Sequence, residues 1–240
     1  MTALVDAGGT RRPVQRGFTV ALTGADGAGK STVAAELVRT LGLPARYLYM
    51  GVNLETSRVV LPSTWLILTV KRMRGGRPDL APHGPASGSA SASGRGRALS
   101  TAKSALRLAN LVAEEWFRQA LVARSHRRGE VVVCDRHFYA DYLAHDISDR
   151  AGKSWPVRVH GALLDRFYPR PDVVIALEAP PGVLLARKGE GTVESLRRRQ
   201  EEYRELRTHV QHYATVDASR PLAEVVSAAA EVVRQHAAER

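Results

Sequence analysis

Residues 24–32 constrain the fold of this chain more than any other segment. They read Gly-Ala-Asp-Gly-Ala-Gly-Lys-Ser-Thr, which fits the pattern G-x-x-x-x-G-K-[ST] without a gap. The pattern has a physical meaning only between a buried strand and a helix. Here the apolar run 18–23 precedes it, and residues 31–41 follow with helical spacing that ends at Gly42. The segment therefore predicts a phosphate-binding loop between a strand and a helix.

The residue types in this loop explain which ligand it suits. Glycines let several backbone N–H groups point at one anion, and the following helix adds the positive end of its dipole. The Lys30 ammonium can reach the β- and γ-phosphates, and the Ser31 hydroxyl can bind Mg²⁺. We therefore expect ATP and Mg²⁺ as the cofactors.

The rest of the chain alternates buried strands with helices. With 240 residues, 44% of them hydrophobic, it can bury one substantial core. Further strands are expected at residues 46–50, 131–134, 173–177 and 213–217. Further helices are expected at residues 62–74, 99–127 and 157–167, from residue 180, and at 192–212 and 222–238. This alternation predicts an α/β fold, a doubly wound parallel sheet with helices on both faces.

The expected domain organisation is simple. Residues 1–16 are expected to form a loose leader, and residues 17–240 a single domain. Residues 75–97 are rich in Gly, Ser, Pro and Ala and lack the apolar residues of a core. Because helical patterns flank them, we expect a mobile insertion within the domain and not a domain boundary.

Asp135 directly follows the apolar run 131–134. Beside a phosphate loop, a carboxylate at a strand end can hold Mg²⁺ or its water and orient the attacking hydroxyl. The alternative is a carboxylate that caps the following turn. Arg136 can bind an acceptor phosphate or stabilise charge on the transferred group, or it can be an ordinary surface arginine. For His137 the structural role is favoured over a role in binding.

Charge and cysteine content bear on partners and compartment. The net charge is +11, with a pI near 10.4. A basic protein of this kind can bind nucleic acid or small phosphorylated substrates, or its charge can reflect the composition of the source genome. The single cysteine, Cys134, fits a reducing cytoplasm. No apolar run is long enough to span a membrane.

With these residues identified, the chain resembles the thymidylate kinase family. Residues 24–32 are similar to that family's G-x-[DE]-G-[AS]-G-K-[ST]-T loop, and Asp135-Arg136-His137 resembles its Asp-Arg-aromatic motif. Similar blocks occur in family order over residues 17–60, 105–145 and 170–238. The resemblance implies a P-loop NTPase fold, with five parallel strands in the order 2-3-1-4-5, and transfer of the γ-phosphoryl group of ATP.

The resemblance also implies a set of nucleotide-binding residues. The phosphate loop carries no Arg, and in the family an arginine of the mobile lid then compensates. Residues 187–199 correspond to the lid, where Arg187 is the best candidate to lie over adenine or reach the phosphates. The expected catalytic residues are Lys30, Asp135, Arg136 and Arg187, and the expected metal ligands are Ser31 and Asp135. The expected nucleotide-binding residues are Asp26, Gly27, Ala28, Gly29, Lys30, Ser31, Thr32 and Arg187.

The acceptor side departs from the family pattern. Gly51-Val52-Asn53 follows the second strand, where the family has Phe-Pro-Arg or Arg-Glu-Pro-Gly. Beyond Arg136 the chain carries Asp141 where the family has a small polar group. These departures argue against thymidine monophosphate as the acceptor. The expected acceptor-binding residues are Asp26, Arg136, Tyr139, Asp141 and Tyr142.

Three classes of function fit the sequence. The favoured one is a kinase for a small acceptor, foremost a nucleoside monophosphate, with a nucleoside, sugar or biosynthetic intermediate as the alternative. A nucleic-acid-linked P-loop protein, such as a polynucleotide kinase, is disfavoured because interleaved aromatic and basic residues are sparse. The third class is a nucleotide-dependent switch without an acceptor. The oligomeric state stays open, and a homodimer is compatible with the sequence.

Overall fold

The computed structural model describes residues 16–50, 61, 64, 65, 69, 73, 94–143, 153–189 and 191–240. The chain divides into two compact units. The first unit comprises Met1–Leu48, Leu121–Arg136 and Pro171–Arg240. The second unit comprises Tyr49–Ala120 and His137–Arg170.

A five-stranded sheet forms the centre of the first unit. Its strands are β1 (Thr19–Thr23), β2 (Ala45–Tyr49), β3 (Val131–Asp135), β4 (Val173–Glu178) and β5 (His212–Asp217). They lie in the order β2-β3-β1-β4-β5. Strand β1 is parallel to both of its neighbours, β3 and β4. Strand β4 is also parallel to β5. The strand order and the fold class predicted from the sequence are confirmed.

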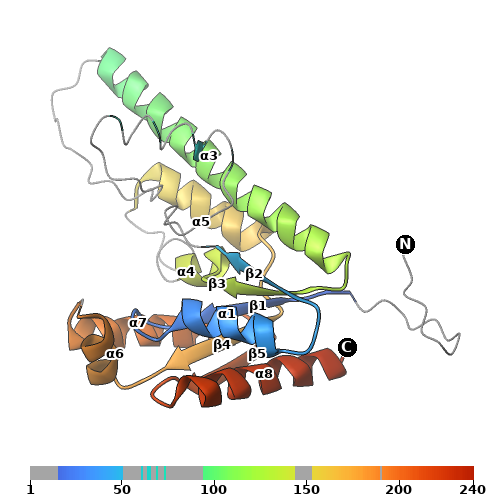
Figure 1. Ribbon diagram of the computed structural model, residues 1–240. Helices are drawn as coiled ribbons and strands as arrows, with labels where there is room; N and C mark the ends of the chain where they lie inside the picture. The colour runs from blue at the N-terminus through green and yellow to red at the C-terminus, as the bar shows by residue number, and fades with distance from the viewer. Residues whose placement is uncertain are drawn as a thin grey trace, which may run out of the picture. The chain divides into compact units, whose positions relative to one another are not determined.

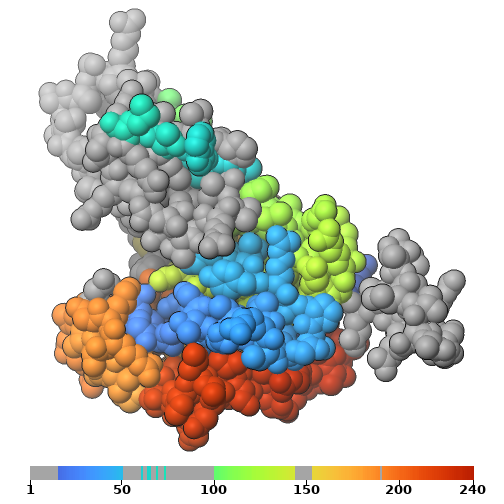
Figure 2. All heavy atoms as spheres, in the orientation of Figure 1, coloured from blue at the N-terminus to red at the C-terminus, as the bar shows by residue number. Residues whose placement is uncertain are grey.

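Helices of the first unit flank the sheet. They are α1 (Lys30–Thr40), α6 (Pro181–Lys188), α7 (Val193–Glu205) and α8 (Leu222–Ala238), with a 3₁₀ turn, η2 (Leu206–Thr208), after α7. Helix α1 packs against α8, and α6 packs against α7. Figure 2 shows α1 and α8, in blue and red, side by side on the visible face.

The core of the first unit lies between the sheet and these helices. Val20 of β1 and Ile175 of β4 are completely buried, and Leu37 of α1 and Val233 of α8 pack into the same cluster. Full burial of one such side chain contributes about 1.5–3 kcal/mol. This rigid layer places the carboxyl ends of β1, β3 and β4 at one edge, where the phosphate loop begins.

The second unit consists mainly of helices where the structure describes it. It contains α4 (Phe138–Tyr142), α5 (Trp155–Phe167) and most of α3 (Gly94–His126), whose last turns from Leu121 belong to the first unit. The three helices are labelled in Figure 1. None of the helices in the described ranges combines the length and apolarity needed to cross a bilayer.

Some sequence-based boundaries differ from the structure. The helix expected over 192–212 ends at Glu205, because the buried Leu206 accepts hydrogen bonds from the N–H groups of His209 and Val210 in a tighter turn. Helix α3 begins at Gly94, inside the segment expected to be an insertion. Most of that segment, residues 75–93, lies outside the described residues, as do the leader at 1–15 and most of the helix expected over 62–74.

Candidate active site

The phosphate loop lies between β1 and α1, as the sequence predicts. Gly24 has φ 144° and Gly27 has φ 87°. A Cβ added at Gly24 would lie 2.5 Å from the carbonyl oxygen of Leu177, and one at Gly27 would lie 2.7 Å from that of Leu184. The loop therefore packs so tightly against the end of β4 and against α6 that both positions require glycine. This packing holds the loop at the N-terminus of α1, where backbone N–H groups favour an anion.

Lys30 is the first residue of α1, and its side chain folds back over the loop. It is 7% exposed. The ammonium donates hydrogen bonds to the carbonyl oxygens of Gly24 at 2.7 Å and Ala25 at 3.1 Å. The positive charge is thus already held inside the loop, within reach of the place where phosphate oxygens would lie.

Asp135 ends β3 and meets the start of α1. It is 1% exposed. Its Oδ2 accepts hydrogen bonds from the hydroxyl of Ser31 and, at 3.2 Å, from the hydroxyl of Tyr47 on β2. Its Oδ1 is buried and has no hydrogen-bond partner among the described residues. Mg²⁺ prefers oxygen ligands, and this site offers the Ser31 hydroxyl and the Asp135 carboxylate, whose Oδ1 is unsatisfied. Ser31 and Asp135 therefore fit this ion.

Arg136 follows Asp135 in a left-handed backbone conformation, with φ 63°. It is the only non-glycine residue with positive φ among those the structure describes, and such strain concentrates at functional sites. Its guanidinium lies 3.0 Å from Oδ1 of Asp26 in the phosphate loop, and the ammonium of Lys188 lies 3.7 Å from the same oxygen. The backbone twist therefore directs the Arg136 side chain toward the loop.

Asp26 is surrounded by positive charge. Partial burial alone would raise its pKa, but the charges of Lys30, Arg136 and Lys188 together lower the pKa below the ordinary value of 3.8. The carboxylate is therefore ionised at neutral pH. It neutralises part of the cationic cluster at the mouth of the loop.

Arg187 lies at the end of α6. Its guanidinium donates a hydrogen bond to the carbonyl oxygen of Ala218, just after β5, at 2.8 Å. The role expected for Arg187 at the adenine or the phosphates stays a prediction. Thr32 of α1 is exposed, and Ala28 in the loop is buried.

The expected acceptor residues of α4 belong to the second unit. Tyr139 and Tyr142 are buried, whereas Asp141 is half-buried. The ring of Tyr139 lies under the guanidinium of Arg170, 5.1 Å away, and Tyr142 meets the ring of His160 edge-on at 4.9 Å. Both tyrosines thus pack within their own unit, which leaves Asp141 as the more accessible polar group of α4.

His137 is 1% exposed and contacts the ring of Tyr168 at 5.8 Å. Burial lowers the pKa of His137 to about 3, so that the imidazole is neutral. This placement agrees with the structural role favoured from the sequence.

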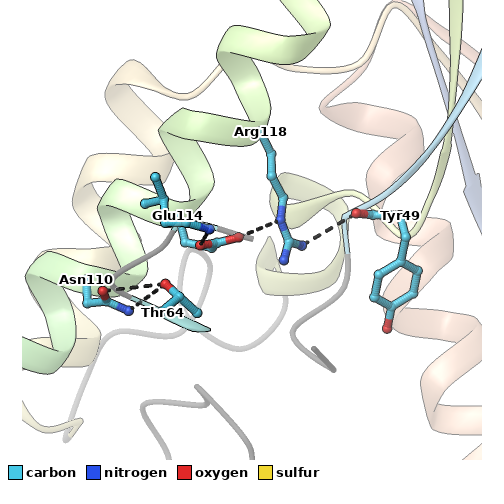
Figure 3. A network of polar contacts seen from close by, with 6 residues as sticks. Tyr49, Thr64, Asn110, Glu114 and Arg118 are labelled. Atoms are coloured by element: carbon cyan, nitrogen blue, oxygen red, sulfur yellow. Dashed lines mark hydrogen bonds and ion pairs between the residues drawn. The ribbon is translucent and has the colours of Figure 1, made fainter. Parts of the chain in front are cut away.

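The sequence reasoning missed a buried polar network on α3 (Figure 3). Arg118 is 1% exposed, and its Nε donates to Oε1 of Glu114 at 3.1 Å. The second oxygen of Glu114 accepts the backbone N–H of Leu61 at 3.0 Å. Next to this pair, the buried Glu115 lies 2.8 Å from Nε2 of His160. The i, i+4 spacing of Glu114 and Arg118 was the available signal.

Tyr47 was also missed. It is the exposed middle residue of β2, and its contact with Asp135 spans 88 positions of the sequence. No local pattern around Tyr47 indicates that contact.

Comparisons with known proteins support the fold. No model of a known protein family matches the sequence, and no curated protein matches it. Among solved structures, thymidylate kinase from Candida albicans is similar, with a TM-score of 0.53 and 18% sequence identity over 92% of each chain. Together with the strand order and the loop between β1 and α1, this similarity shows that the chain has a thymidylate kinase-like P-loop fold.

Proposed function

We propose that this protein is an ATP-dependent phosphotransferase that moves the γ-phosphoryl group to a small acceptor, foremost a nucleoside monophosphate. The observation that carries the proposal is the meeting of Lys30, Ser31 and Asp135 at the end of the sheet. The kinase-like fold supports the class of reaction. The residues of the site, and not the fold, argue for the activity itself.

Each residue has a separate role in the proposed reaction. The loop N–H groups and Lys30 hold the β- and γ-phosphates, and the ammonium exchanges its contacts with Gly24 and Ala25 for phosphate oxygens. Ser31 and Asp135 would hold Mg²⁺, which would supply positive charge to neutralise the charge that develops on the transferred group. Through its buried Oδ1, Asp135 would hold the ion or a water of the ion, and so help to orient the attacking hydroxyl.

Arg136 is the proposed contact to the acceptor. A planar guanidinium suits a phosphate because two N–H groups can bind two of its oxygens. We expect thymidine monophosphate to be a poor acceptor, because the sequence after β2 and the carboxylate of Asp141 depart from the family pattern. The side chain of Asp141 can instead accept hydrogen bonds from sugar hydroxyls or an amino group.

A second candidate is a kinase for an acceptor without a phosphate. The observation that favours it is the ion pair between Arg136 and Asp26, which offsets the charge that would otherwise bind an acceptor phosphate. In this version Arg136 fastens the phosphate loop to the end of β3. The two candidates differ in whether the acceptor needs Arg136.

The test is a screen of ADP release with nucleosides, nucleoside monophosphates, sugars and a 5′-hydroxyl oligonucleotide. We expect ADP release to depend on one class of nucleoside monophosphate. The rate of release should fall by about 10²-fold or more in Lys30→Ala and in Asp135→Ala. Lys103→Ala, an exposed lysine of α3, is the matched control and should turn over normally. Normal turnover in either site variant, at saturating ATP and Mg²⁺, contradicts the site assignment.

A further inference from the structure

A second cluster of chemically active side chains lies at the edge of the sheet opposite the phosphate loop. His212 is the first residue of β5 and pairs with Val173, the first residue of β4. The phosphate loop follows the carboxyl end of β1, and these strands run parallel. His236 in the last turn of α8 and Glu239 just after it complete the cluster.

The geometry of this cluster is compatible with a metal site. One ligand atom from each of His212, His236 and Glu239 lies within 4.8 Å of the others. The rings of the two histidines meet edge-to-face, with their centroids 4.4 Å apart. Since Zn²⁺ binds nitrogen and oxygen at about 2.0–2.2 Å, small side-chain rotations bring all three atoms onto one ion.

His236 supplies an independent observation that points to a ligand. It is 8% exposed, and both of its ring nitrogens are buried without a hydrogen-bond partner among the described residues. A buried imidazole with two unsatisfied nitrogens costs desolvation free energy that its contact with the ring of Phe18, 4.8 Å away, does not recover. A bound ion would satisfy one of these atoms.

The surrounding charges permit a cation here. Arg240 follows Glu239 in the chain, but its guanidinium pairs with Asp172 at 3.2 Å and lies over the ring of Phe18.

We infer that His212, His236 and Glu239 bind a divalent first-row transition ion such as Zn²⁺, which ties the end of α8 to the start of β5. Two imidazoles and one carboxylate suit Zn²⁺ and its neighbours, whereas Mg²⁺ prefers oxygen ligands alone. Water completes the coordination. The role is structural, because α8 packs on α1 and on the sheet that carries the phosphate loop.

The experiment is a calorimetric titration of the full chain, free of any histidine tag and of nucleotide, with ZnCl₂ and then CoCl₂. We expect the wild type to bind one ion per chain. His212→Gln and Glu239→Gln should each weaken this binding by at least about tenfold, and should each remove the visible absorption bands of tetrahedral Co²⁺. Both residues are exposed, so these variants should fold. His209→Gln and Glu231→Gln, outside the cluster, are matched controls that should bind normally.

Thermal unfolding gives a second readout. With Zn²⁺ at about 100 times the dissociation constant of the wild type, the midpoint of the wild type should rise by about 5 to 10 °C. The midpoint of His212→Gln, with at least about tenfold weaker binding, should rise by at most about half as much. Any shift of the thermal midpoint that Mg²⁺ causes should be the same in His212→Gln and in the wild type. Zn²⁺ binding that is absent, or that is the same in the cluster variants and the controls, would overturn the inference and leave His236 as an aromatic core residue.

Discussion

Replacing Arg136 by glycine should separate function from stability. The residue has φ 63°, and a left-handed conformation costs a side-chain-bearing residue roughly 1–2 kcal/mol. Glycine removes this strain. Two effects destabilise the glycine variant. Glycine has greater backbone freedom in the unfolded chain, which costs about 0.5–1 kcal/mol, and the ion pair with Asp26 is lost. Since both partners of that pair are partly exposed, it contributes about 0–1 kcal/mol.

These contributions nearly cancel, so Arg136→Gly should change the free energy of unfolding by less than about 1 kcal/mol. For a chain of this size that corresponds to less than about 4 °C in the thermal midpoint. Arg136→Ala loses the same ion pair but keeps the strain, so it should be less stable than the glycine variant by about 0.5–1 kcal/mol. The order of the two variants therefore reports the strain directly.

Catalysis should respond differently. Under the proposed function, both variants should lose about 10²-fold in kcat/KM for the acceptor, because a charge that binds phosphate has been removed. Urea unfolding and steady-state turnover with the best acceptor measure the two effects on the same preparations. A loss of more than about 2 kcal/mol in stability with activity unchanged would refute this reasoning, because Arg136 would then be a structural residue.

Three further predictions concern other groups. Because the pKa of Asp26 is lowered from 3.8 in the folded chain, its ion pairs stabilise the fold fully above that value and are lost as the pH falls through the folded pKa. The unfolding curves of wild type and Asp26→Asn should thus differ at pH 6 and converge as the pH falls through the lowered pKa of Asp26. Asp141→Asn should change the KM of the acceptor more than that of ATP, and initial rates with each substrate varied in turn would show the opposite if Asp141 served the nucleotide. Glu115→Ala should lower the free energy of unfolding by about 1–3 kcal/mol, because it removes the hydrogen bond between that carboxylate and the buried His160; an unchanged free energy of unfolding in urea would contradict that reading.

Local signals explain why part of the site could be predicted from the sequence. The residues from Gly24 to Ser31 are consecutive, and their glycines, lysine and serine have the spacing of a phosphate-binding loop, so one local pattern predicts both the loop and its chemistry. Asp135 was predictable because the apolar run before it places it at a strand end. The parallel sheet followed from the alternation of strands and helices, and its strand order from the family resemblance.

Long-range contacts explain what could not be predicted. Tyr47 reaches Asp135 across the sheet, and the left-handed conformation of Arg136 depends on the packing around it. Charged residues inside an amphipathic helix normally face solvent, yet Glu114 and Arg118 are buried as a pair. Tyr139 is fully buried, as an aromatic residue after a strand often is, and its expected contact with the acceptor stays a prediction.

Transfer of the labelled γ-phosphoryl group from ATP to an acceptor is the direct test of the proposed reaction. We predict that label appears in one class of acceptor, in proportion to ADP released, and that Asp135→Ala abolishes its appearance while the variant still unfolds cooperatively. Label found only in inorganic phosphate, at a rate indifferent to every acceptor offered, would contradict the claim and indicate a nucleotide-hydrolysing switch instead.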